Sequence, residues 1–191
     1  MPWKVTSAPA TEPVTTAEAK LHLNIPDAVT DWDALIAELV KSAREHIEKL
    51  TGQAFVTQTV QEFIDNFDTI ACMGEMTLSR YPIASITHIK YTDTAGAQQT
   101  WANTNYATDL VSRRPRIAMK TAGTIPENSD EINSIEIQYV CGYGAAAAVP
   151  AQFKTALKLL VGELFENREN RAYTLPDRLH SYLFREMDYT F

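Results

Sequence analysis

Cysteine and glycine are scarce in this sequence, and long apolar runs are absent from it. The two cysteines, Cys72 and Cys141, are too few for a disulfide framework. The seven glycines stand apart except for Gly142 and Gly144, so there is no glycine-rich loop that would cradle a phosphate. No stretch approaches the roughly 18 apolar residues of a membrane span, and the N-terminal segment has no charged region followed by an apolar one. We therefore expect a protein without signal peptide or membrane span that works in a reducing compartment.

An excess of basic residues is also missing. The 24 acidic and 17 basic residues give a formal net charge of −7. Tight binding of nucleic acid needs a concentrated basic face that neutralises phosphates, so this balance argues against it. An acidic protein can still work beside DNA if its role is to let the duplex slide past.

Residue patterns that carry catalysis or bind metals are absent as well. The four histidines stand apart from one another and from the cysteines, without HxxxH or CxxC spacing, and no GxSxG turn is present. Asp31 and Asp33 fit the favourable position of acids at a helix start. An enzyme would need a site assembled from distant residues such as Asp31, His46 and Arg168. We therefore expect no enzyme activity, no cofactor and no metal.

Helical patterns lie near both ends of the chain. Thr15 and Glu18 fit a capping box that opens a short helix through Leu23. Apolar residues then recur at helical spacing from Thr30 or Asp31 to Leu50, and Gly52 ends that helix. A second strong amphipathic pattern follows Pro150 and continues to about residue 170, and a last short helix is expected over 177–185.

The middle of the chain is rich in β-branched and aromatic residues that alternate with polar ones, a pattern typical of strands. About six short strands are expected there, and Asp93 to Gly96 predict a hairpin turn. The predicted fold is α+β, a helical core of packed N-terminal and C-terminal helices with an inserted small antiparallel β unit. We expect a flexible N-terminal arm at 1–14, because it is rich in proline and small polar residues, a helical core at 15–52 plus 150–191, and the antiparallel insert at 53–149.

Two groups of side chains are candidates for contact with partners. The only basic cluster surrounds Pro115, and three arginines in such a loop are more often solvated than bound to nucleic acid. The second long helix ends in a charged segment, which fits either solvation or contact with a neighbouring subunit, and the chain end is rich in aromatic groups that need cover. The candidate contact residues are Arg113, Arg114, Arg116, Glu166, Arg168, Glu169, Tyr182, Phe184, Tyr189 and Phe191.

Several short motifs follow one another from about residue 15 to residue 170. They are Thr15–Lys20 followed by a leucine, Asp33–Ile36, Leu50–Gly52 leading into Gln58–Thr59, Arg80–Ile83, Tyr91–Asp93 with Gly96, Gly142–Gly144 before Val149–Pro150, and Leu160–Leu164 ending in Glu166–Glu169. Each is common alone, but their order and spacing over most of the chain are specific. In this succession the sequence resembles the phage head-tail connector family, the gp6-like group.

The resemblance implies a structural subunit of a tailed bacteriophage or prophage, found in the virion and, during assembly, in the host cytoplasm. Such a subunit would form a homo-oligomeric, twelvefold ring below the portal protein and offer a surface to a tail-side completion or stopper protein. DNA would pass through the ring without specific binding. The long strand-rich segment departs from the simplest, almost wholly helical members, and we interpret it as an insert on the ring's periphery. The alternatives are a nucleic-acid or small-ligand binding module on that segment, or an enzyme of unknown class.

Overall fold

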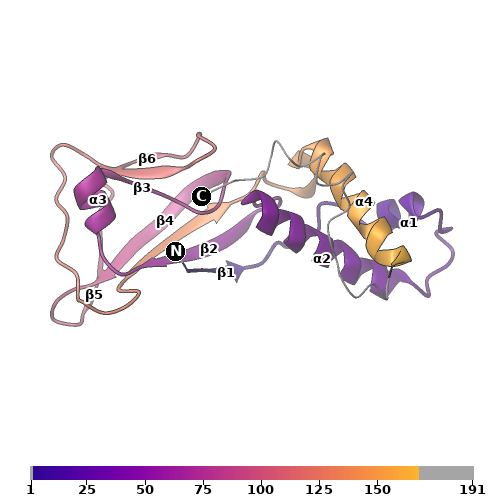
Figure 1. Ribbon diagram of the computed structural model, residues 1–191, viewed down its shortest axis with the longest axis horizontal. Helices are drawn as coiled ribbons and strands as arrows, with labels where there is room; N and C mark the ends of the chain where they lie inside the picture. The colour runs from indigo at the N-terminus through magenta and orange to yellow at the C-terminus, as the bar shows by residue number, and fades with distance from the viewer. Residues whose placement is uncertain (1, 168–191) are drawn as a thin grey trace. The chain divides into compact units, whose positions relative to one another are not determined.

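The computed structural model describes residues 2–167, and these form two compact units, each assembled from two separate pieces of chain (Figure 1). The β unit consists of Met1–Pro9 and Thr57–Tyr143, and the helical unit consists of Ala10–Val56 and Gly144–Phe191. The fold is therefore a mixture of helices and antiparallel sheets, as expected from the sequence. The helix predicted over 177–185 lies outside the described residues.

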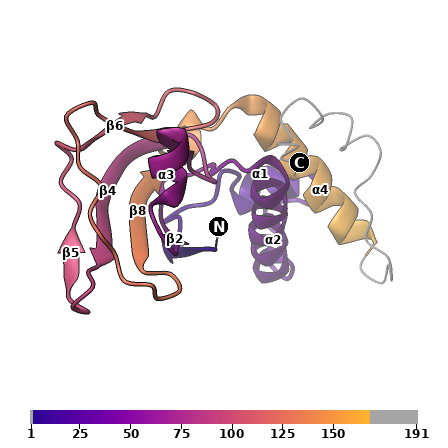
Figure 2. The same ribbon diagram turned by 60° about the vertical axis from the view of Figure 1, so that its left-hand side comes forward.

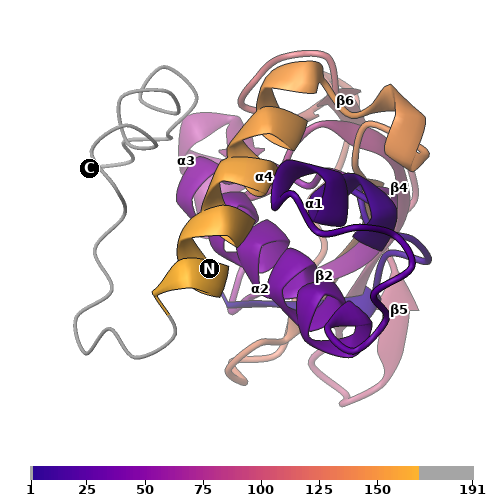
Figure 3. The same cartoon turned by 90° about the vertical axis from the view of Figure 1, so that its right-hand side faces the viewer.

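The helical unit is built on two amphipathic helices that are distant in sequence. It contains α1 (Thr16–His22), α2 (Asp33–Thr51), a short 3-10 turn η1 (Ala146–Ala148) and α4 (Ala151–Glu166). Figure 3 shows α4 crossing beside α2, with α1 next to both. Their facing side chains are at most 2 % exposed: Ile36, Val40, Ala43 and Ile47 on α2, and Phe153, Ala156, Leu157, Leu160 and Val161 on α4. Each helix thereby buries the apolar stripe that its sequence period predicts.

The ends of these helices follow from local sequence. Thr15 and Glu18 form the predicted capping box at the start of α1. Gly52 ends α2 with a φ of 70°, a left-handed conformation that glycine adopts without steric cost. The helix begins at Asp33, slightly later than predicted, because the amide of Asp33 is bonded to the carbonyl of Thr30 in a preceding turn.

The β unit contains eight strands in two antiparallel sheets. The larger sheet has the order β1-β2-β8-β4-β5 and the smaller one β3-β7-β6. Figure 2 shows β2, β8 and β4 as curved ribbons lying side by side. The strands are β1 (Trp3–Ser7), β2 (Gln58–Ile64), β3 (Glu75–Thr77), β4 (Ile83–Thr92), β5 (Gln98–Thr100), β6 (Tyr106–Asp109), β7 (Arg116–Met119) and β8 (Ile135–Cys141), with the helix α3 (Asp68–Met73) after β2.

The central strand β8 shows why this segment folds as a sheet. Its alternate residues Ile135, Ile137, Tyr139 and Cys141 are fully buried, whereas the residues between them are partly exposed. This alternation matches the two faces of a strand. The predicted turn at Asp93 to Gly96 joins β4 to β5, with Gly96 at a φ of 81°.

The N-terminal segment differs from the expected flexible arm. Trp3–Ser7 form β1, which pairs antiparallel with β2. The prolines at positions 2 and 9 lie outside this strand, so every residue inside it has an amide available for the sheet. Composition indicated an arm because proline is abundant there, but the spacing of the prolines leaves room for one short edge strand.

Candidate functional site

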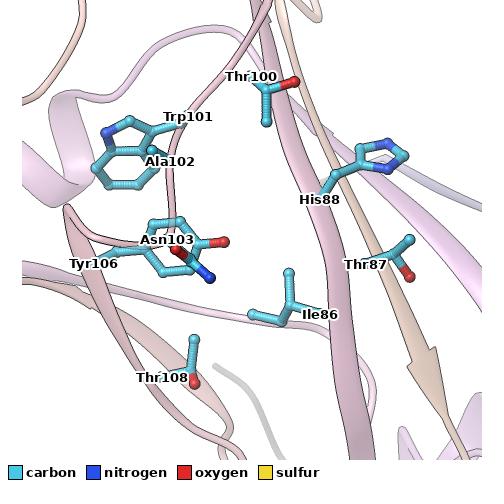
Figure 4. Close-up of a pocket in the computed structure, with 9 residues that line it drawn as sticks. All are labelled: Ile86, Thr87, His88, Thr100, Trp101, Ala102, Asn103, Tyr106 and Thr108. Atoms are coloured by element: carbon cyan, nitrogen blue, oxygen red, sulfur yellow. The ribbon is translucent and has the colours of Figure 1, made fainter.

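The β unit has a cleft of about 450 Å³ between β4 and the chain that follows β5 (Figure 4). Side chains from three elements surround it, and most of its polar groups are neutral hydroxyls or an amide. The lining residues are Ile86, Thr87, His88, Thr100, Trp101, Ala102, Asn103, Tyr106 and Thr108.

The aromatic groups of this cleft serve the core of the unit. Trp101 is 3 % exposed and its indole nitrogen donates to the carbonyl oxygen of Thr124 at 2.9 Å. Its ring lies 5.0 Å from that of Tyr106, centroid to centroid. Burial raises the pKa of Tyr106, so its hydroxyl stays neutral at physiological pH. These rings are therefore packed elements and do not form an open stacking platform.

The one titratable imidazole of the cleft is held by the sheet. A ring nitrogen of His88 lies 2.9 Å from Oε1 of Glu136, and the amide of Gln61 donates to the same carboxylate oxygen. These contacts tie β4, β8 and β2 together across one face. The cleft suits a small polar group held by neutral hydrogen bonds, and its lining contains no nucleophile paired with a base.

The predicted basic cluster lies in the hairpin between β6 and β7, and two of its arginines are engaged inside the β unit. Nε of Arg113 donates to the hydroxyl of Tyr81 at 3.0 Å. Arg116 forms ion pairs with Glu75 at 2.9 Å and with Asp109 at 3.3 Å. Hydrogen bonds from the side chain and backbone of Ser112 lower the pKa of Asp109, so this carboxylate stays charged.

Arg114 is exposed, as are Arg113 and Arg116, and Glu166 is the exposed last residue of α4. The remaining candidate contacts, Arg168, Glu169, Tyr182, Phe184, Tyr189 and Phe191, lie outside the described residues.

A second hollow, of about 330 Å³, lies in the helical unit between residues 11–16 and α2. Its wall on α2 is formed by Ala37 and Val40. The segment opposite is fixed by Glu12, whose carboxylate accepts from Nε of Arg44 at 2.7 Å. The hollow is mostly apolar and presents no arrangement for catalysis.

Among residues 2–167, no group of three histidine, cysteine or acidic side chains is placed to hold a metal ion. The distant site considered from sequence does not form between Asp31 and His46. Asp31 precedes α2 and His46 lies thirteen residues beyond its first residue, Asp33, which is about 20 Å along a helix axis. Within the same described range, no helix combines the length and the hydrophobicity that crossing a membrane requires.

Sequence reasoning missed the burial of several charged groups, among them Arg44 and Glu62. Both stand at inward positions of otherwise apolar patterns, Arg44 beside Ala43 on α2 and Glu62 two residues after Val60 on β2. A charged residue in such a position is the signal that would have revealed them, because burying a charge requires specific partners.

Comparison with known proteins gives a family and a fold. Residues 14–111 match the model of the phage gp6-like head-tail connector proteins. No curated protein matches the sequence.

Solved structures share the fold, and three of them illustrate the match. The first, from the virion of a native gene transfer agent particle, has 22% identity and a TM-score of 0.83, and the match covers 100% of this chain and 97% of that one. A chain from the neck of an empty particle computed with C6 symmetry has 20% identity and a TM-score of 0.82, with the same coverage. One from the neck of a native particle computed with C12 symmetry has 21% identity and a TM-score of 0.77, again with 100% and 97% covered.

The coverage of these matches includes the strand-rich segment, which the sequence suggested was a departure from the simplest members of the family. Since each match covers the whole chain, the shared fold includes the β unit. The family match extends over more than half of the sequence and includes residues of the helical unit and the β unit. The chain therefore belongs to the family of phage gp6-like head-tail connector proteins, and its role is that of a structural head-tail connector.

Proposed function

We propose that this protein is one subunit of a twelvefold ring in the neck of a tailed bacteriophage or related particle, between the portal protein and a tail-side completion protein. The observation that carries the proposal is the whole-chain fold match to a neck protein whose particle was computed with C12 symmetry, together with the family match. Head-to-tail contacts between identical subunits close into a ring when the rotation between neighbours fits, and a twelvefold axis is one such closure.

In this proposal the helical unit is the connector core and the β unit is an insert on the ring's periphery. The pairing of α2 with α4 supports it, because these helices bury their apolar stripes against each other and leave polar faces outward. The exposed positions of α2 include Glu38, Lys41, Glu45 and Lys49. Charges of both signs on one helix face suit contact with an identical neighbour, where they set orientation.

DNA passes through the ring in this proposal without being held. The net charge of −7 supports that role, since a mildly acidic wall repels phosphates and leaves the duplex free to move. The contacts of Arg113 and Arg116 point the same way, because these guanidinium groups already bind Tyr81, Glu75 and Asp109. No enzyme activity is needed for such a role.

The partner contacts that we propose are Arg114 of the β unit, Glu166 at the end of α4, and the charged and aromatic groups beyond residue 167. Arg114 and Glu166 are exposed and charged, which suits the rim of a protein interface. The aromatic residues near the C-terminus would dock on other virion components.

The test is to mix the protein with its cognate portal and to measure stoichiometry by native mass spectrometry and electron microscopy. We expect twelve copies on each portal ring, and a protein that neither binds the portal nor forms rings under any condition would overturn the proposal. The variant Arg114→Glu should weaken ring or portal binding, whereas Lys120→Glu, an equal change of charge in the same unit, should not. Duplex DNA should not bind at low salt; a steep salt-dependent affinity would favour the nucleic-acid module instead.

A further inference from the structure

We infer that β1 is exchanged between neighbouring subunits of the ring, so that Trp3–Ser7 of one copy pair with β2 of the next copy. This inference rests on the proposed ring. The acceptor is the edge of β2 that faces away from β8. The strand that pairs with this edge is the N-terminal strand of a second copy of this chain.

The first observation is how β1 is held. All five of its residues are exposed, including Trp3 at 40% and Val5 at 43%. It is fixed by its backbone ladder to β2, and two cations stack on rings: the Arg80 guanidinium 4.0 Å from the Trp3 centroid, and Lys4 Nζ 5.0 Å from the Phe63 centroid. Every one of these partners belongs to the part of the β unit after residue 57, so a neighbouring copy offers the same set.

The second observation is the connection between β1 and the rest of its own chain. The β unit's first piece ends at Pro9, and the chain continues directly into the helical unit at Ala10. Ala8, Ala10 and Thr11 are exposed, and the next side chain held by an ion pair is Glu12, bonded to Arg44 at 2.7 Å. Residues 8–11 span at most about 14 Å when extended, and the proline favours an extended backbone. The short linker therefore restricts an exchanged strand to the copy packed directly beside its own.

The third observation is that β2 needs a strand on this side. Trp3 stands opposite Glu62 in the register, and Glu62 is fully buried. Without β1, β2 would present a row of unpaired backbone groups, and Arg80 would lose the ring that covers it. In a closed ring each copy donates one strand and receives one, so every edge is paired.

Strand exchange also stabilises the contact between neighbouring subunits without adding new kinds of interaction. The hydrogen bonds and ring contacts of an exchanged strand are the same as those within one chain, so the free energy of the strand itself changes little. Assembly brings the acceptor close, and a high local concentration then favours pairing between chains. Each subunit becomes tied to its neighbour by a strand that must unpair before the subunit can leave.

The test uses cysteines at two positions that are opposite in the register, Lys4 and Gln61. Directly opposite positions of antiparallel strands lie within reach of a disulfide. The background is Cys72→Ser, because Cys72 is exposed and Cys141 is buried. Rings on the portal, checked by native mass spectrometry, are oxidised and run on a non-reducing gel. The double variant Lys4→Cys/Gln61→Cys should give a ladder of covalent multimers, and a ring assembled from the two single variants mixed should give cross-linked dimers.

The outcomes distinguish a failure of strand exchange from a failure of ring formation. Rings whose double variant gives only monomers with an internal disulfide would overturn the exchange and leave the ring standing. If no ring forms, the proposed function fails and the exchange fails with it. The control pair Lys4→Cys/Gln138→Cys, with Gln138 one strand further away on β8, should give no cross-link. If Gln61→Cys does not fold, Ser7→Cys with Thr59→Cys tests the same register.

Discussion

The helical unit and the β unit both bury charged side chains, and the surroundings of Arg44 in the first differ from those of Glu62 in the second. In the helical unit, Arg44 is 4% exposed and donates to Glu12 at 2.7 Å and to Glu48 at 2.8 Å. Glu48 also accepts the backbone amide of Phe55 at 2.7 Å. Burial alone lowers the pKa of Arg44, but its bonds to the two carboxylates raise it overall, so the guanidinium stays charged.

In the β unit one buried charge is Glu62, and it accepts hydrogen bonds from two hydroxyl groups and a backbone amide. Tyr139 donates to it at 3.0 Å and the amide of Ser79 at 3.1 Å, and the Ser79 hydroxyl bonds to it as well. Burial, and then the charge of Glu62, raise the pKa of Tyr139 well above its usual range, so this hydroxyl always has a proton to donate. Both arrangements join segments that are distant in sequence: the ion pair of Arg44 joins Glu12 to α2, and the hydrogen bonds of Glu62 join β2 to Tyr139 on β8 and to Ser79.

The largest expected effect comes from breaking the ion pairs of the helical unit. Arg44→Met leaves Glu48 buried beside an apolar group and should lower the free energy of unfolding by about 3–5 kcal/mol. Lys41→Met, an exposed change on the same helix, should cost less than about 0.5 kcal/mol. Urea denaturation followed by circular dichroism measures both. Equal stabilities of the two variants would show that the buried guanidinium contributes nothing.

A smaller loss is expected from the β unit. Glu62→Gln keeps the size of the side chain but replaces one acceptor oxygen by an amide group that faces donors, which should cost about 1–3 kcal/mol. The exposed change Glu131→Gln is the matched control. Thermal unfolding followed by near-ultraviolet circular dichroism, which reports on Tyr139 and Trp101, measures the difference. A Glu62→Gln protein as stable as its control would remove the contrast between the two units.

The smallest change in the free energy of unfolding is expected at an exposed carboxylate, Glu18. It can be compared directly with the changes expected at the buried charges. The backbone amide of Thr15 donates to Glu18 at 2.8 Å, and this bond lowers the pKa of Glu18 from 4.5. Glu18→Ala should cost less than about 1 kcal/mol at pH 7. Because the folded pKa is lowered, the contribution is present above the unfolded value and is lost as the pH falls through the folded one.

The measurement is the stability difference between wild type and Glu18→Ala at pH 7 and at pH 3. We expect the difference to shrink at pH 3. Glu38→Ala, which removes an exposed acid of α2, serves as the reference. A difference that stays constant between the two pH values would mean that the capping box adds no charge-dependent stability.

The helical elements could be predicted from sequence because their signals are local. The Thr15 cap, the period of α2 and the stop at Gly52 each depend on residues within a few turns of chain, and the structure has all three. The partner of α2 was also expected, because neither long helix can bury its stripe alone.

The β unit was predicted less completely, because pairing in a sheet is not local. The sequence predicted strands, from alternating β-branched and aromatic residues, and the turn at Gly96. The strands that pair with β2, however, come from residues 3–7 and 135–141. Nothing in a window of ten residues selects those partners. The short helix α3 was missed, since its six residues offer less than two turns of pattern.

The candidate contacts show the same limit. The arginines around Pro115 were recognised as a cluster, but the ion pairs of Arg116 with Glu75 and Asp109 depend on residues 41 and 7 positions earlier in the chain. Surface charge is visible in a sequence, whereas its neutralisation by folding is not.

The two-piece construction of each unit also sets when the chain can fold during synthesis. The apolar face of α2 waits for α4, which begins at Ala151, and β2 waits for β8, which begins at Ile135. A ribosome has therefore made about three quarters of the chain before either core can close. Such late closure leaves apolar surface exposed for seconds on a growing chain, a period in which chaperones bind. Shortening the protein from its C-terminal side into α4 would remove the partner of α2 and leave the first half of the helical unit without a core.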